Sequence, residues 1–194
     1  MADRSLGMIE QFGHEVEVAA GESVRERVMT GADSLRPKAK PEAIALWLRE
    51  AIDRLDAAAP PGVAAKVMEG CGAACSGVNH NIVERAKARR AKHATEESFL
   101  TAEMRKPQNG TRLERDGATL YQIYAPAAFS HPMRCFCGLM RGLPAEVAVS
   151  PTYCQCSRAF VRAFWSEVLG RPVGVEVLET AITGSTECRF KIEL

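Results

Sequence analysis

Seven cysteines are the residues of this chain best suited to chemistry, and six of them come in close pairs. Thiolates bind Zn²⁺ and iron–sulfur clusters, and a free thiolate is also a nucleophile and a redox group. An odd number of cysteines fits a closed disulfide framework poorly. The cysteines therefore indicate metal, redox or ligand chemistry. They are Cys71/Cys75, Cys135/Cys137, Cys154/Cys156 and, alone, Cys188.

The spacing of each pair matches the element predicted to carry it. Residues four apart share a face of a helix, as predicted for the first pair. Residues two apart share a face of a strand, as predicted for the second pair and, if that stretch is extended, for the third. We expect Cys154, Cys156 and Cys188 to meet at one end of a helix–hairpin unit, with a fourth ligand from Cys135 or Cys137. The start of a helix near Cys156 would also favour its thiolate form.

Core packing is the alternative explanation for these residues. Free cysteine is among the most buried residue types and often behaves as a small hydrophobe. Cys71 and Cys75 lie on one stripe with Val63 and Val67, so packing and a second thiol pair at the site are equally supported. No pair has the CxxC spacing of zinc fingers.

Charge and hydropathy exclude several classes of partner. The net charge is +1, which gives no electrostatic case for nucleic acid. No apolar run approaches the length of a membrane span, and the N-terminus lacks the apolar core of a signal peptide. We therefore expect a cytoplasmic protein, with no membrane partner and with reduced thiols.

The N-terminal half has helical periodicity. Apolar residues recur at helical spacing from Pro41 to Leu55, a second helix carries the first thiol pair, and shorter helices run to about Arg105. Residues 1–34 are interrupted by four glycines. They are predicted to be peripheral, with one helix over 23–30.

The period changes to two after Lys106. A β-hairpin is predicted over 111–124, and residues 133–137 alternate as a strand. Ser157 is predicted to cap a helix that ends at Gly170, and two strands rich in valine and aromatic residues follow.

These elements predict an α+β fold, in which a helical N-terminal half packs on a C-terminal antiparallel sheet with a helix–hairpin unit. Residues 1–105 form the helical region, and 106–194 form the cysteine-rich region that binds ligand and metal. The sequence is compatible with two separate regions and also with one continuous domain that has a shared core.

Aromatic residues of the second region are candidates to line an apolar pocket between the C-terminal helix and the sheet. Ordinary core packing is the alternative for the same residues. The candidates are Phe160, Phe164, Trp165, Tyr121 and Phe136.

The stretch from Cys154 to Ile192 resembles the 4-vinyl-reductase domain family. The shared pattern is a cysteine before a helix, a helix that ends in glycine, a valine-rich strand, and then Glu–Cys–x–x–x–Gly–x–x–x–Cys–x–Phe. Here the last element runs from Glu179 to Phe190, with Thr180 at the position of its first cysteine. The family includes the sensor domains of phenol-responsive regulators.

The resemblance implies an α+β fold, a cavity for a small apolar or aromatic molecule, a structural zinc site beside it, and a homodimer. Cys188 corresponds to the final zinc ligand, and Cys154 or Cys156 to the ligand before the helix. The other cysteine of that pair, or Cys135 or Cys137, would replace the ligand missing at 180.

The sequence thus predicts a sensor-like protein that binds a small molecule and holds a cysteine thiolate metal site, with structural zinc as the cofactor. The alternative is a redox or cysteine-dependent enzyme, reductase-like, with an iron–sulfur cluster.

Overall fold

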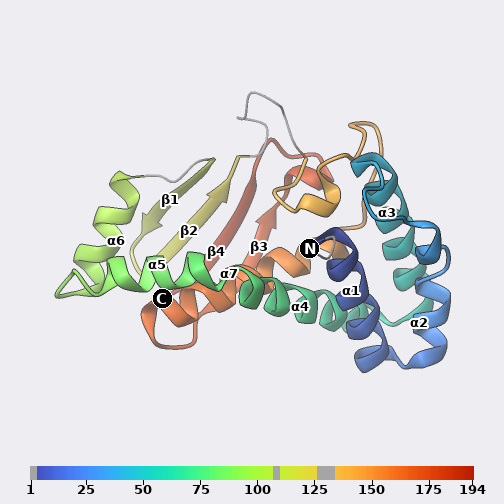
Figure 1. Cartoon of the computed structure of the whole chain (residues 1–194). Coiled ribbons are helices and arrows are strands. Elements are labelled where there is room, and N and C mark those ends of the chain that lie inside the picture. The colour runs from blue at the N-terminus through green and yellow to red at the C-terminus, as the bar shows by residue number, and fades with distance from the viewer. Residues whose placement is uncertain (1–3, 107–109, 126–133) are drawn as a thin grey trace.

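The computed structural model describes residues 4–106, 110–125 and 134–194. Within these ranges the chain forms seven α-helices and one antiparallel sheet with strand order β1-β2-β4-β3 (Figure 1). The predicted α+β fold, with its sheet in the C-terminal half, is confirmed. The elements are α1 (Arg4–Ala20), α2 (Glu22–Val28), α3 (Pro41–Ala58), α4 (Pro61–Val78), α5 (His80–Arg90), α6 (Glu96–Arg105), β1 (Thr111–Asp116), β2 (Thr119–Tyr124), α7 (Cys154–Leu169), β3 (Gly174–Glu179) and β4 (Cys188–Glu193), with short 3₁₀ turns η1 (Ala32–Ser34), η3 (Gly138–Met140), η4 (Pro151–Tyr153) and η5 (Ala181–Thr183).

The prediction of a peripheral N-terminal segment was wrong, because α1 contributes to the core. Ile9, Phe12 and Val16 are buried, and their spacing is that of one helical face. The glycines that obscure this pattern lie within the helix. A Cβ on Gly13 would come within 3.0 Å of Met29 Cε, so the missing side chain lets the end of α2 pack against α1.

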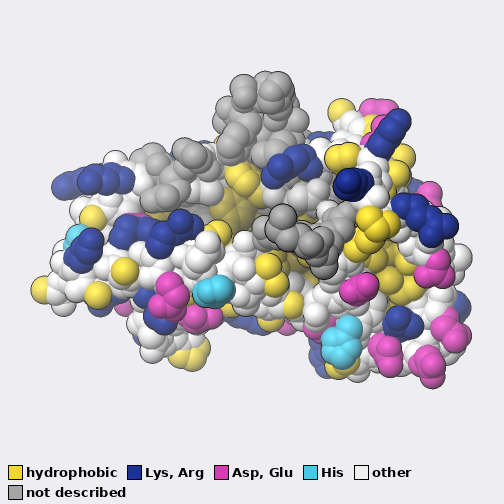
Figure 2. Space-filling view, viewed as in Figure 1, with side chains coloured by type: hydrophobic (Ala, Val, Ile, Leu, Met, Phe, Trp, Pro, Cys, Tyr) yellow, Lys and Arg dark blue, Asp and Glu magenta, His cyan; other side chains and the backbone are white. Residues whose placement is uncertain are grey.

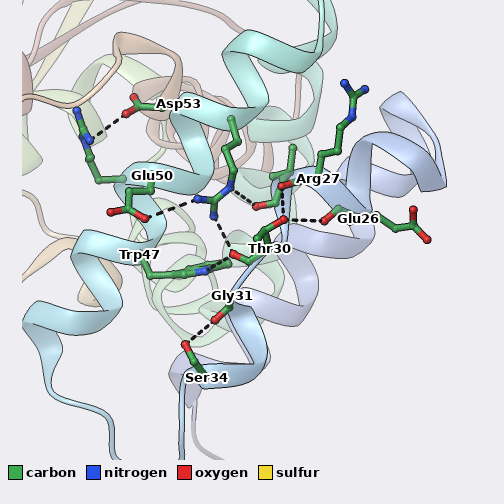
Figure 3. A network of polar contacts seen from close by, with 11 residues as sticks. Glu26, Arg27, Thr30, Gly31, Ser34, Trp47, Glu50 and Asp53 are labelled. Carbon is green, nitrogen blue, oxygen red and sulfur yellow. Dashed lines mark hydrogen bonds and ion pairs between the residues drawn. The ribbon is translucent and has the colours of Figure 1, made fainter.

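Side chains of α3 hold the end of α2 (Figure 3). Arg54 Nε donates to Val28 O at 3.0 Å and Arg54 Nη2 to Thr30 O at 3.1 Å. Trp47 Nε1 also donates to Thr30 O, at 3.0 Å. Carbonyls at the end of a helix lack partners within that helix, so these donors fix the turn onto α3.

Local sequence signals mark the starts of the middle helices. Both α3 and α4 have proline at the first turn, where its missing N–H costs nothing. Thr95 Oγ1 accepts a hydrogen bond of 3.1 Å from Ser98 N and caps α6. In the described ranges, no helix has the length and apolar character needed to cross a membrane.

The predicted hairpin is confirmed, with β1 and β2 paired from Thr111↔Tyr124 to Asp116↔Thr119. Gly117 adopts a φ of +56° in its turn, a conformation that favours glycine. The helices α5 and α7 pass in front of the sheet in Figure 1. On this inner face Phe190 and Ile192 join one apolar cluster with Val161 and Trp165 of α7.

The outer face of the sheet carries a closed ring of ion pairs. Arg112 contacts Glu187 at 2.9 Å and Glu114 at 3.0 Å, while Arg189 contacts Glu114 and, at 3.8 Å, Glu187. The hydrogen bond from Arg112 lowers the pKa of Glu114. Ile123 is fully buried, and its cross-strand neighbours are Arg112 and Arg189.

Two apolar cores divide the molecule, and neither matches the predicted boundary after residue 105. The first joins α1 to α4 with residues 135–156, and the second joins the sheet with α5, α6 and most of α7. Segments from both sides of residue 106 therefore contribute to each core. The helix α7 begins in the first core, at Cys154, and continues into the second.

Candidate functional site

All seven cysteines converge where the two cores meet. They come from four segments, namely α4, the loop before η3, the start of α7 and the start of β4. Four of them pack against the first core, Cys154 is buried within it, and Cys188 packs against the second. None of the seven forms a disulfide. The four packed against the first core are Cys71, Cys135, Cys137 and Cys156.

A close contact between α4 and α7 brings the first and third pairs together. A Cβ on Gly72 would lie 2.2 Å from Cys156 O and 2.8 Å from Ala159 Cβ. Only glycine allows this approach. It brings the part of α4 that carries Cys71 and Cys75 beside the first turn of α7, and both thiols raise the pKa of Cys156.

The loop that carries the second pair is irregular, so the predicted strand over 133–137 is wrong for its described part, 134–137. Residue 133 lies outside the described residues. Cys137 N donates to Cys135 Sγ at 3.4 Å, so the chain turns tightly and the two thiols do not share a strand face. The Tyr153 side chain hydrogen-bonds the Cys137 thiol.

Arg134 anchors this loop. Its Nη1 donates to Pro144 O at 2.9 Å and to Val147 O, and its Nη2 donates to Ile182 O at 3.0 Å. One guanidinium thus joins the thiol loop, the segment before η4 and the turn before β4. Such multiple hydrogen bonds from a charged donor are strong and directional.

The start of α7 differs from the prediction. The helix begins at Cys154, and Ser150 caps the preceding 3₁₀ turn by accepting from Thr152 N at 3.2 Å. Ser157 is therefore an internal residue and not the cap. Because Cys154 and Cys156 are both helical, their side chains point about 160° apart around the helix axis instead of sharing a face.

The turn before β4 contacts two thiols. The Thr180 side chain hydrogen-bonds Cys154, and Ala181 N donates to Cys188 Sγ at 3.3 Å. Thr180 is itself buried. The residue that stands where the resemblance implies a metal ligand therefore lies beside Cys154 and supplies a hydroxyl instead.

Burial dominates the electrostatics of the cluster. It raises the pKa of Cys71 to about 12 and that of Cys154 to about 11, and it raises the pKa of Cys156 well above its ordinary value. Neighbouring thiols raise the pKa of Cys71 and Cys156 further. At neutral pH these thiols are protonated in the metal-free protein, contrary to the thiolate predicted for Cys156 at a helix start.

The same pKa shifts identify which thiols are neighbours. Cys137 raises the pKa of Cys156 most among the thiols, and Cys71, Cys75 and Cys135 raise it less. The pKa of Cys71 is raised by Cys137 and Cys75.

On the other side of the cluster, the thiols that raise the pKa of Cys135 are Cys137, Cys188 and Cys154. The thiol that raises the pKa of Cys154 is Cys188. Among the described residues, no group of three or more His, Cys, Asp or Glu side chains is arranged to hold a metal ion.

Aromatic side chains lie next to the thiols on the inner face of the sheet. The Tyr124 ring is 5.2 Å from that of Phe136 and 5.3 Å from that of Phe190. Gln122 Nε2 donates to the Tyr124 hydroxyl at 3.1 Å, and Trp165 Nε1 donates to Gln122 Oε1 at 2.6 Å. Burial raises the pKa of Tyr124, and among the neighbouring thiols Cys188 raises it most.

The predicted pocket residues do not all come together. Phe164 packs edge-on against Trp165 at 5.3 Å, and Phe136 joins Tyr124, whereas Phe160 is half-buried on α7. Tyr121 points to the outer face, with the Arg189 guanidinium 4.9 Å from its ring centre. It lines a polar hollow of about 400 Å³ there, on the opposite side of the sheet from the other four. In Figure 2 hydrophobic side chains reach the surface above α5, on the side where Figure 1 shows the inner face.

Three residues near the thiols escape sequence reasoning. Tyr153 and Arg134 lie beside cysteines in the chain, but their partners are distant in sequence. Glu15 of α1 raises the pKa of Cys71, and its carboxylate lies against Gly70, where a Cβ would come within 1.9 Å of Glu15 Oε2. The glycines of α4 were the available signal, because Gly70 and Gly72 weaken the helix unless close packing needs them.

Neither a protein-family model, nor a curated protein, nor a solved structure matches this chain.

Proposed function

We propose that this chain is a cytoplasmic, sensor-like protein that holds zinc on cysteine thiolates and binds a small apolar or aromatic molecule next to that centre. The metal ligands would be Cys135, Cys154 and Cys188. The observation that carries the proposal is the convergence of cysteines outside disulfides, from four separate segments, between the two cores. The family resemblance of residues 154–192 supports the same position and adds the expectation of a homodimer.

The chemistry of these donors suits the proposed ion. Each pair among the three thiols interacts electrostatically, and residues 180–181 contact both Cys154 and Cys188. Soft thiolate ligands select zinc or iron–sulfur centres over hard cations. Zinc binding would displace the thiol protons that burial retains. Three thiolates leave one tetrahedral position for a ligand outside the set.

The surroundings suit an apolar ligand. Tyr124, Phe136 and Phe190 form a connected aromatic group at the end of the sheet that carries Cys188. Ligand sites are usually apolar with a few convergent polar groups, and the Tyr124 hydroxyl and Gln122 amide are such groups.

An enzyme with a cysteine nucleophile has less support than the proposed binding function. A reactive cysteine needs a lowered pKa, whereas burial raises the pKa of Cys71, Cys135, Cys154, Cys156 and Cys188. An iron–sulfur redox enzyme stays the alternative, because the same thiolates would bind such a cluster.

The test is metal analysis of protein purified without oxygen. We expect zinc at one equivalent per chain or more, and a loss of at least 0.7 equivalents in Cys154→Ser/Cys188→Ser. A brown protein absorbing near 400 nm would support the iron–sulfur alternative. Protein that binds neither metal, even when refolded with excess zinc under reducing conditions, would refute the proposal.

A further inference from the structure

We propose that the face formed by α1, α4 and α5 binds a second copy of this chain, in an antiparallel two-fold arrangement that sets α5 of each copy against α1 of the other. This goes beyond the proposed function, in which the homodimer is an expectation from a family resemblance with no surface assigned to it. Charge, residue spacing and exposed aliphatic side chains assign the surface and the orientation of the two copies.

The three helices follow one another on one side of the molecule. Figure 1 shows α5, α4 and α1 from left to right on the viewer's side, with the junction of α4 and α5 near the middle. From this middle, α5 leads away toward α6 at the left, and α1 leads away toward α2 at the lower right. A two-fold axis near the junction therefore lays α5 of each copy along α1 of the other.

The two ends of this face carry opposite charges. From His80 to Lys92 the chain has five Lys or Arg residues and one Glu, whereas α1 has three Glu and one Arg. Figure 2 shows Lys and Arg side chains over α5 and α6 at the left, and Asp and Glu side chains over α1 and α2 at the lower right. Complementary charges orient two partners, and like charges disfavour the parallel arrangement, in which each end would meet its own copy.

The charged positions at the two ends have the same spacing. Outward from the middle of the face, Arg85 of α5 is followed by Lys92 in the turn after the helix, and Glu10 of α1 is followed by Glu17. All four residues are exposed. Both pairs are seven residues apart, which is two helical turns or roughly 10 Å. In the antiparallel arrangement Arg85 therefore meets Glu10 of the other copy, and Lys92 meets Glu17.

These charges are available to a second copy. Within the described part of the chain, Arg85, Lys92 and Glu10 have no ion-pair partner. Glu17 contacts Arg25 at 3.3 Å, yet its side chain stays 51 % exposed. A dimer would therefore form new ion pairs without breaking the contacts that hold each chain together.

The same three helices expose aliphatic side chains. Four large hydrophobic side chains are exposed among the described residues, and three of them belong to α1, α4 and α5, namely Val18 (69 %), Val78 (62 %) and Ile82 (41 %). Val78 and Ile82 are four residues apart at the junction of α4 and α5, close to the proposed two-fold axis. Single exposed aliphatic residues are common, but a group of them bordered by charges is typical of a surface that binds another protein.

Sedimentation equilibrium of the full-length chain and of two charge-swapped variants tests this inference. We expect the wild type to be a dimer whose Kd rises several-fold between about 50 mM and about 500 mM salt, because salt screens exposed charges. Arg85→Glu/Lys92→Glu and Glu10→Lys/Glu17→Lys should each raise the Kd about tenfold or more, since two-fold symmetry turns four attractive contacts into repulsive ones. An equimolar mixture of the two variants should form a heterodimer with nearly the wild-type Kd, because each swapped helix then meets an opposite charge.

The matched control lies on the outer face of the sheet. Glu176→Lys/Glu193→Lys changes the charge of the chain by the same amount as Glu10→Lys/Glu17→Lys, at side chains that are also mostly exposed, and should leave the Kd unchanged. Should a double variant fail to fold, as judged by its far-ultraviolet circular dichroism, the single variants Arg85→Glu and Glu10→Lys replace the swapped pair, with the same expected heterodimer.

Three results would overturn the inference. They are a monomeric wild type, a dimer that neither swapped variant weakens, and a mixture of the two variants that stays monomeric. Zinc analysis of the same samples keeps this inference separate from the proposed function. A monomer that holds zinc would refute the dimer and leave the metal site standing, and a dimer without zinc would do the reverse.

Discussion

The two faces of the sheet are built from alternate residues of the same strands, but they deal with ionisable groups in opposite ways. On the outer face, Arg189 and its neighbours form a ring in which each charge has an opposite charge beside it. On the inner face, Cys188 and Tyr124 lie opposite each other in register, and burial keeps both groups neutral by raising their pKa.

The difference shows which face of the sheet carries ionisable groups that are not already neutralised by an opposite charge. Charges that are paired in water contribute little free energy and are already neutralised by their partners. Burial keeps the thiols of the inner face protonated and uncharged instead. The sheet therefore separates a face of paired charges from a face of buried, neutral ionisable groups.

The largest expected loss of stability comes from a substitution on the inner face. Phe190→Ala removes a ring that is 1 % exposed, and we expect it to lower the free energy of unfolding by about 3–5 kcal/mol. Leu178→Ala, on the outer face of β3 and 46 % exposed, is the matched control and should change it by less than about 0.5 kcal/mol. Urea denaturation measures both. Equal losses would mean that the two faces are equally buried.

A second pair of variants extends the comparison to the helices over the inner face. Gly72→Ala would force a Cβ against the Cys156 carbonyl, and we expect destabilisation of about 1–3 kcal/mol. Gly77, in the same helix, has no atoms within 4 Å of such a Cβ, so Gly77→Ala should stabilise by up to about 1 kcal/mol. Thermal unfolding of both gives the sign directly. A stabilised Gly72→Ala would show that α4 and α7 do not touch there.

The neutral state of the buried thiols predicts a loss of stability at high pH. Burial raises the pKa of Cys154 from 9.0 to about 11, so the folded chain keeps a proton that the unfolded chain releases. This contribution is complete below about pH 9 and is lost as the pH rises towards 11.

Between pH 8 and pH 10.5, metal-free wild type should lose about 1–2 kcal/mol more than Cys154→Ser, at 1.36 kcal/mol per pKa unit. Denaturation at the two pH values, with reductant present, measures this difference, and serine provides the control because it does not titrate. The same loss in both proteins would place Cys154 in contact with water.

The smallest effect concerns the outer face. Glu187→Gln removes one carboxylate from the ring, and we expect a loss of about 0.2–1 kcal/mol at low salt. Salt of about 1 M should abolish most of this difference, because it screens exposed charges. A loss above about 2 kcal/mol that is unaffected by salt would show that the ring is not a solvated network.

Much of the fold could be predicted from sequence, because local rules decide it. Prolines begin α3 and α4, Thr95 caps α6, and alternation gives the hairpin of β1 and β2. The failures occur where a distant contact overrides a local signal. The glycines of α1 read as breaks, although Gly13 is small because Met29 packs on it.

The residues of the candidate site could be predicted from sequence, but which cysteines lie next to each other could not. The cysteines stand out by type and spacing, whereas the direction of each thiol depends on the exact residue at which an element begins. A shift of the start of α7 from Ser157 to Cys154 changes the third pair from residues on one strand face to residues that point to different sides of a helix. The alternation around Cys135 suggested a strand, but the shape of this loop is set by Arg134 and three backbone carbonyls 10 to 48 residues along the chain.

The three carbonyls bound by Arg134 also set an order of events during protein synthesis. The last of them belongs to Ile182, so the thiol loop obtains its final anchor only after residue 182 has left the ribosome. Cys71 and Cys75 emerge more than a hundred residues earlier, in a helix whose partners α1 and α3 precede it but whose partner α7 does not yet exist. A chain that stopped after α7 would display six of its seven cysteines without their final anchor. Truncated products of this protein should therefore be prone to oxidation and to removal by proteases, while the finished chain hides the same thiols.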